Sequence, residues 1–168
     1  MPIEIRSEAA SDIADIEALT TNAFLHAPHT SHTEQFIVNA LRKAGQLAIS
    51  LVATDGGAIV GHVAVSPVSI SSGAGGWYGI GPVSVLPERQ GKGIGSALVS
   101  RALDDLHMAG AAGCVVLGEP GYYARFGFRA EPALVLPGVP QEYFQTLSFN
   151  GSVPSGTVSY DEAFNATY

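Results

Sequence analysis

Residues 83–96 read Val83-Ser84-Val85-Leu86-Pro87-Glu88-Arg89-Gln90-Gly91-Lys92-Gly93-Ile94-Gly95-Ser96, an apolar strand followed by a glycine-rich loop and the start of a helix. Glycine lets the backbone approach a ligand closely and adopt positive φ. A helix start leaves N–H groups without intrahelical partners at the positive end of the helix dipole, and together they attract phosphate. Arg89 and Lys92 add cationic donors. The stretch therefore predicts a pyrophosphate site.

The glycine spacing excludes two common phosphate loops. A Walker A loop requires G-x-x-x-x-G-K-[ST], but Lys92 lies between two glycines. A dinucleotide fingerprint requires G-x-G-x-x-G, whereas here glycines alternate at 91, 93 and 95. The remaining pattern is Gln90-x-x-Gly93-x-Gly95, with a ligand-free helix start as the alternative interpretation.

Upstream of the loop, periodicity predicts one strand, two helices and a meander. The expected strands are 3–6, 47–54, 58–65, 68–71 and 77–85, and the expected helices are 12–24 and one that Thr33 caps and that ends near Gly45. Gly79, Gly81 and Pro82 weaken the last strand and indicate a bulge or splay. No charged residue occurs from Gly56 to Pro87, but no run of about 18 apolar residues does either. We therefore expect buried strands and no membrane segment.

Downstream, the pattern predicts a helix over 93–108, a buried strand over 114–117, a short helix over 120–126 and strands near 143–149 and 156–160. The order predicts an α/β (α+β) fold with a mixed, mostly antiparallel sheet flanked by helices. The chain has 168 residues, 46% of them hydrophobic, which suits a single domain over 1–168. Residues 130–168 would complete the sheet, form a wall of the acceptor site or make a dimer contact.

The charge balance excludes some partners. Fifteen acidic residues face eight basic ones, for a net charge of −7, so a nucleic-acid partner is not expected. Cys114 is the single cysteine, and the N-terminus shows no secretory pattern. These features predict a reduced, cytoplasmic protein.

Two motifs resemble those of the GNAT family of N-acetyltransferases, closest to its YhbS-like branch. Gln90-x-x-Gly93-x-Gly95 is similar to the family's coenzyme A loop, [RQ]-x-x-G-x-[GA]. Tyr123, four residues before Gly127-Phe128, fits its Y-x-x-x-G-F segment. The resemblance runs from Ile3 to about Phe128. Glu119-Pro120-Gly121 departs from it, since many members carry an asparagine there.

The resemblance implies acetyl-coenzyme A (acetyl-CoA) as the cofactor, with its pantetheine arm in a gap between splayed strands. An amine would attack the acetyl group directly in a ternary complex, and Tyr123 would protonate the departing thiolate. Tyr122 is the competing acid, and Cys114 is interpreted as a buried hydrophobe rather than a nucleophile. The implied cofactor contacts are Val83, Ser84, Val85, Arg89, Gln90, Gly91, Lys92, Gly93, Ile94, Gly95, Ser96, Tyr123, Arg125 and Phe126.

The general base stays open between His62 and Glu119. The alternatives are a hydrogen-bonded structural histidine and a solvated or capping glutamate. His26, His29 and His32 share one loop, but no carboxylate or cysteine accompanies them there, so acceptor contact or solvation is expected rather than metal.

The predicted function is acetyl-CoA-dependent N-acetylation of a primary amine on a small molecule or peptide. A non-catalytic acyl-CoA binding or sensing module, or transfer of a longer acyl group, are the alternatives. The acidic balance favours a cationic acceptor.

Overall fold

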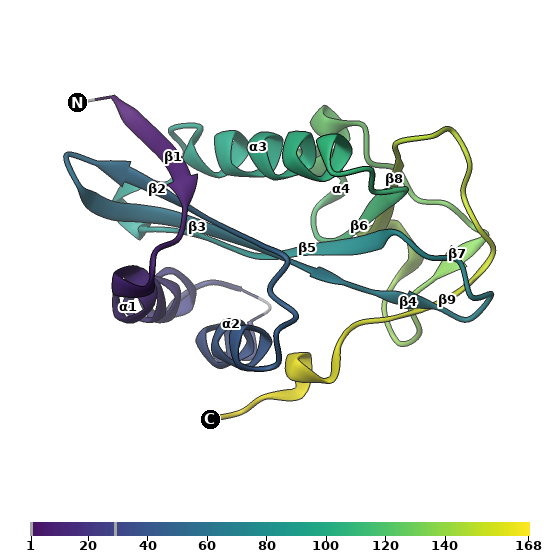
Figure 1. Ribbon diagram of the computed structural model, residues 1–168, viewed down its shortest axis with the longest axis horizontal. Coiled ribbons are helices and arrows are strands. Elements are labelled where there is room, and N and C mark those ends of the chain that lie inside the picture. The colour runs from purple at the N-terminus through teal and green to yellow at the C-terminus, as the bar shows by residue number, and fades with distance from the viewer. Residues whose placement is uncertain (1, 29) are drawn as a thin grey trace. The chain divides into compact units, whose positions relative to one another are not determined.

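The structure is a computed structural model that describes residues 2–28 and 30–168 (Figure 1). The helices are α1 (Ile13–Phe24), α2 (Glu34–Lys43), α3 (Ile94–Met108) and α4 (Pro120–Tyr123). The strands are β1 (Ile3–Ser7), β2 (Ile49–Asp55), β3 (Ala58–Pro67), β4 (Ser69–Ile70), β5 (Trp77–Val85), β6 (Gly113–Leu117), β7 (Leu134–Val135), β8 (Phe144–Ser148) and β9 (Gly156–Ser159). Single 3₁₀ turns cover Ala10–Asp12, Pro87–Arg89, Ala124–Phe126, Gln141–Tyr143 and Glu162–Asn165.

Two sheets hold these strands. The larger has the order β1-β2-β3-β5-β6-β8, and the smaller has the order β4-β9-β7. In the larger sheet β1 with β2, β2 with β3, and β6 with β8 pair antiparallel, while β5 and β6 pair parallel. The helix α3 makes the crossover that a parallel pair requires. The predicted mixed, mostly antiparallel sheet is confirmed.

Contacts divide the chain into two compact units. The first contains Met1–Ser66, Gly81–Ala102 and Glu162–Tyr168, and the second contains Pro67–Ile80 and Leu103–Asp161. Both β5 and α3 contribute residues to each unit. No helix in the described part of the chain is long and apolar enough to cross a membrane.

The core of the first unit forms where α1 and α2 pack on β2 and β3. Ile16 and Val38 on the helices contact Val52 and Ala64 on the strands, and all four are buried. Side chains alternate between the two faces of a strand, so Gly61 faces the other way. A Cβ there would lie 3.0 Å from both Ile94 and Leu98, so the start of α3 packs closely on the opposite face.

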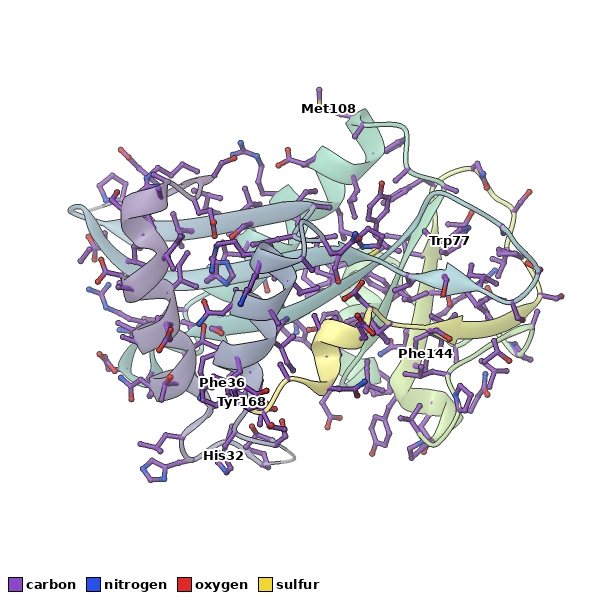
Figure 2. The ribbon with its side chains drawn as sticks, turned by 60° about the horizontal axis from the view of Figure 1, so that its bottom comes forward. His32, Phe36, Trp77, Met108, Phe144 and Tyr168 are labelled. Carbon is purple, nitrogen blue, oxygen red and sulfur yellow. The ribbon has the colours of Figure 1, made fainter. Side chains whose placement is uncertain are left out.

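The core of the second unit gathers around Trp77 and Phe144 (Figure 2). Both rings are buried with Val115, Leu134 and Val158. Gly113 makes room for the indole, because a Cβ at that position would lie 2.4 Å from the Trp77 ring.

Three details of the C-terminal third and the meander differ from the sequence prediction. The strand expected over 143–149 begins only at Phe144, after the turn Gln141–Tyr143. The strand expected over 68–71 is shorter, since β4 holds only Ser69 and Ile70, and β3 extends to Pro67, two residues beyond its expected end. The smaller sheet was not foreseen: β9 pairs with β4 and β7, and two-residue strands carry no readable periodicity.

Candidate active site

The glycine-rich loop of the first unit has the backbone that the sequence predicts. Gly91 and Gly93 have φ values of 76° and 84°, which favour glycine. Gly91, Lys92 and Gly93 are exposed, while Ile94 is buried and anchors the helix start. The first turn of α3 is closed by a bond from the Ala97 amide to the Gly93 carbonyl at 3.0 Å. The loop thus presents exposed backbone ahead of a 15-residue helix, the arrangement that suits an anion.

Two residues of this loop that were predicted to bind the cofactor instead form hydrogen bonds with other residues of the protein. The Arg89 guanidinium donates to the Asp55 carboxylate at 2.7 Å, at the tip of the β2–β3 hairpin. The Gln90 side-chain amide donates to the Val85 carbonyl at 3.0 Å. Arg89 and Gln90 therefore fix the loop to the neighbouring strands, and Lys92 is the exposed cation between the glycines.

The last residues of β5 differ in their burial and in the direction of their side chains. Val83 and Val85 are half-buried, whereas Ser84 is buried and its hydroxyl donates to Thr20 of α1 at 3.5 Å. Ser84 therefore points toward the helix layer, and alternation directs Val83 and Val85 to the opposite face.

In the second unit, Tyr123 occupies a tight aromatic setting at the end of α4. Its ring lies 5.0 Å from that of Tyr122 and 5.9 Å from that of Phe128, both edge to face. Gly118 makes this placement possible, because a Cβ there would lie 2.4 Å from the Tyr123 ring. Burial raises the pKa of Tyr123 to about 12, with smaller contributions from Tyr122 and Cys114. The phenol is therefore protonated at neutral pH and available as a donor.

The other predicted residues of this segment surround Tyr122. The Arg125 guanidinium lies 4.3 Å over the Tyr122 ring and donates from Nε to the Tyr122 carbonyl at 2.9 Å. Phe126 is half-buried, with its ring 5.7 Å from Tyr122. Glu119 is exposed, and its carbonyl accepts the amides of Tyr122 and Tyr123 at 3.1 Å. The Glu119 backbone thus begins α4.

His62 belongs to a hydrogen-bonded network of polar side chains inside the first unit. The Arg42 guanidinium donates two hydrogen bonds to the Glu8 carboxylate, at 2.9 and 2.7 Å. Ser50 bonds both Glu8 and the Nε2 atom of His62, the latter at 2.8 Å. His62 is fully buried, and its Nδ1 has no hydrogen-bond partner among the described residues.

The donor and acceptor roles along this series of hydrogen bonds determine the tautomer of His62. Burial would raise the pKa of Glu8, but hydrogen bonds from Arg42 and Ser50 outweigh it and lower the value. An ionised carboxylate only accepts, so the Ser50 hydroxyl donates to Glu8 and accepts from His62 Nε2–H. Burial lowers the pKa of His62 to about 4, so Nδ1 is a neutral, unprotonated nitrogen in the interior.

The remaining residues that the sequence singled out are Cys114 and the histidines of the loop between α1 and α2. Cys114 is buried, and burial raises the pKa of its thiol, which suits a core residue. His26 and His32 are exposed in the loop between α1 and α2, and Figure 2 labels His32 there. His29 lies outside the described residues. Residues 2–28 and 30–168 contain no cluster of three or more potential metal ligands.

Comparison with known families decides the identity of the fold. The model of the acetyltransferase (GNAT) domain matches residues 4–130, which include both motifs. The chain belongs to the GNAT family of acetyltransferases.

Relatives of this GNAT protein support the assignment at the level of sequence and structure. It is 39% identical over 125 residues to the uncharacterized N-acetyltransferase YhbS of Escherichia coli, covering 74% of this chain and 72% of YhbS. A GNAT family acetyltransferase from Brucella melitensis, solved in complex with acetyl-CoA, is 47% identical with a TM-score of 0.87, covering 97% of this chain and 98% of its own. Escherichia coli YhbS in complex with coenzyme A is 36% identical with a TM-score of 0.86, covering 97% and 92%.

Several residues of this GNAT domain escaped the sequence reasoning. Gly118 is adjacent to Leu117 at the end of an apolar strand, and only the folded chain brings it against Tyr123. The contacts of Ser50 with His62 and Glu8 span 12 and 42 residues of sequence, so no local sequence pattern predicts them. The same holds for Tyr160, whose ring lies against Gly79 and beyond the end of the family match.

Proposed function

We propose that this GNAT acetyltransferase binds acetyl-CoA and transfers its acetyl group to a primary amine in a ternary complex. Residues 90–96 would hold the pyrophosphate, with backbone amides at the start of α3 and the Lys92 ammonium as donors. Backbone groups of Val83 and Val85 would bond the pantetheine arm, as the family resemblance implies. The complexes of the two relatives with acetyl-CoA and coenzyme A support this choice of cofactor.

The proposed reaction has one acid and no covalent enzyme intermediate. The amine lone pair attacks the acetyl carbon, the C–S bond breaks, and the thiolate takes a proton from the Tyr123 hydroxyl. The proton that the amine nitrogen loses passes through water and restores the phenol. A thiol of pKa about 8.5 is a stronger acid than this phenol, so the transfer from Tyr123 becomes favourable because the proton lost by the amine nitrogen restores the phenol. The products are the amide and the free thiol, and Tyr123 ends the reaction unchanged.

The observation that carries the proposal is the packing environment of the Tyr123 side chain. A half-buried phenol four residues before Gly127, surrounded by aromatic side chains and packed on a residue without a Cβ, is held in one orientation. An oriented donor contributes more to a transition state than a mobile one, because its ordering cost is already met.

Tyr123→Phe tests the assignment, because it keeps the ring and removes only the hydroxyl. Thiol release from acetyl-CoA is measured with a panel of primary amines comprising free lysine, spermidine and an N-terminal alanyl peptide. We expect turnover to fall by about 10²- to 10⁴-fold, while coenzyme A affinity, measured by calorimetry, stays within twofold. Tyr122→Phe is the matched control and should keep its turnover.

Two outcomes would contradict the proposal. Unchanged turnover in Tyr123→Phe removes the acid assignment, and a loss in Tyr122→Phe instead transfers it to the neighbouring residue. Coenzyme A binding without thiol release across the whole panel, in the unmodified protein, favours a binding or sensing module.

A further inference from the structure

Tyr160 follows β9 in the second unit, and its ring lies against the backbone of β5. A Cβ on Gly79 would lie 2.4 Å from Cε1 and 3.2 Å from Cδ1 of Tyr160. The ring therefore occupies the space that a side chain at position 79 would fill. Gly79 is also the last β5 residue of the register with β6, where it pairs with Val115.

The two strands show on which face each tyrosine lies. Trp77 pairs with Gly113 and Gly79 with Val115, so these four residues share one face of the β5–β6 pair. Tyr160 lies against Gly79 and packs with the cluster that contains Val115, so it is on that face as well.

Tyr123 lies on the opposite face of the same pair. Cys114 and Val116 point away from the Val115 face, and Gly118 continues the alternation because its amide bonds the Tyr143 carbonyl at 2.9 Å, one step past the β6–β8 register. The Tyr123 ring occupies the Cβ position of Gly118. Two phenols thus lie on opposite faces near the end of the β5–β6 register, each over a glycine.

Both phenols remain protonated at neutral pH. Burial raises the pKa of Tyr160, as it does for Tyr123, and the charges of Cys114 and Tyr123 raise it further. A phenol in this state both donates and accepts hydrogen bonds.

We propose that Tyr160 is a second functional tyrosine, whose hydroxyl accepts a hydrogen bond from the acceptor amine and holds it on the face opposite Tyr123. This inference rests on the proposed function. In direct transfer the amine and the departing sulfur occupy different positions on the tetrahedral carbon, so groups on two faces of the strand pair can serve them separately. The amine keeps its lone pair for the acetyl carbon while one N–H donates to Tyr160 Oη. Tyr160 gains and loses no proton over the reaction, so the balance of the acetyl transfer is unchanged.

Tyr160→Phe is the test, because it preserves the ring over Gly79 and removes only the hydroxyl. Thiol release is followed with the same amine panel, and coenzyme A affinity is measured separately. We expect kcat/KM for the amine to fall about 10-fold, the loss of one hydrogen bond of about 1.4 kcal/mol, with coenzyme A affinity within twofold of the unmodified protein. Tyr143→Phe, a partly exposed tyrosine of the same unit, is the matched control and should leave both quantities unchanged.

The outcomes separate this inference from the function on which it rests. If Tyr123→Phe loses turnover and Tyr160→Phe keeps its kcat/KM, the acetyltransferase mechanism stands and the role of Tyr160 is wrong. If coenzyme A affinity falls along with kcat/KM in Tyr160→Phe, the residue supports the cofactor site and the inference is also wrong.

A crystal structure with acetyl-CoA decides the question even if no amine of the panel reacts. A single nitrogen that is hydrogen-bonded to Oη and within attack distance of the acetyl carbon allows a separation of at most about 7 Å between Oη and that carbon. A separation within that span supports the proposal. A larger separation, or a thioester shielded from Tyr160 by β5, overturns it.

Discussion

Burial acts on two titratable side chains of this protein in the same physical way and with opposite chemical results. Removing water disfavours the charged form of either group. For Tyr123 this raises the pKa to about 12 and keeps the phenol as a donor. For His62 it lowers the pKa to about 4, and the ring is fully buried. A weakly basic, shielded imidazole is poorly suited to deprotonate an amine, so these observations favour the structural interpretation of His62 that its sequence left open.

The first residue-scale prediction concerns the protonation of His62. Long-range ¹H–¹⁵N NMR should show the Nε2–H tautomer, because Ser50 accepts from Nε2. The ring should stay neutral from pH 8 down to near pH 4, whereas an exposed histidine titrates near pH 6.5. His62→Gln identifies the resonance. A ring that titrates near pH 6.5, or carries its proton on Nδ1, contradicts the hydrogen-bond direction.

At the scale of elements, the sequence predicted what depends on neighbours in the chain. Glycine spacing and the apolar repeat from Ile94 predicted the loop and α3, and Asp55-Gly56-Gly57 predicted the β2–β3 hairpin. Contacts between residues far apart in the sequence could not be predicted. Arg89 looked free for a phosphate, but the fold brings Asp55 to it at 2.7 Å. The smaller sheet likewise depends on pairings such as Ile70 with Val158 that no local pattern encodes.

The loop at the start of α3 leads to an element-scale prediction with a matched control. Gly93 and Gly110 stand before and after the helix with φ values of 84° and 85°, and a Cβ at either would meet nothing within 4 Å. Alanine at each should therefore cost a similar backbone strain of about 1–2 kcal/mol. Only Gly93→Ala should weaken coenzyme A binding, by about 10-fold, because its amide and neighbours face the proposed pyrophosphate.

Calorimetric titration with coenzyme A and urea unfolding of both variants provide the measurements. Equal affinities in Gly93→Ala and Gly110→Ala would show that the loop does not hold the cofactor. Equal stabilities with a selective loss of affinity are the expected pattern.

On the scale of the whole molecule, the groups with shifted pKa values divide between the two compact units. In the first unit the pKa values of Glu8, Asp12 and His62 are lowered, that of Asp12 to about 2 through its bonds with Arg6 and the Ala9 amide. In the second unit the pKa values of Cys114, Tyr123 and Tyr160 are raised, in each case by burial first. The stability of each unit should therefore depend on pH in a different pH range.

The signs follow from proton linkage. A group whose pKa is lowered by folding stabilises the fold above its unfolded pKa, and this stabilisation is lost as the pH falls through the folded value. The first unit should therefore weaken below about pH 6.5, where unfolded histidine begins to protonate, and further below about pH 4 as carboxylates protonate. A group whose pKa is raised by folding stabilises the fold below its unfolded pKa, so the second unit should weaken above about pH 9 to 10.

Hydrogen exchange measured by mass spectrometry checks this division, with protection factors corrected for intrinsic rates. From pH 7 to pH 4 we expect protection to fall more in β2 than in β6, and from pH 7 to pH 10 more in β6 than in β2, because the titrating groups lie in different units. Tyr160→Phe should reduce the alkaline loss in β6, since it removes one ionisable buried phenol, and Tyr143→Phe should not. Equal losses in both strands at both extremes would mean that the chain opens as one cooperative body, and the division of its pH response between the units would be wrong.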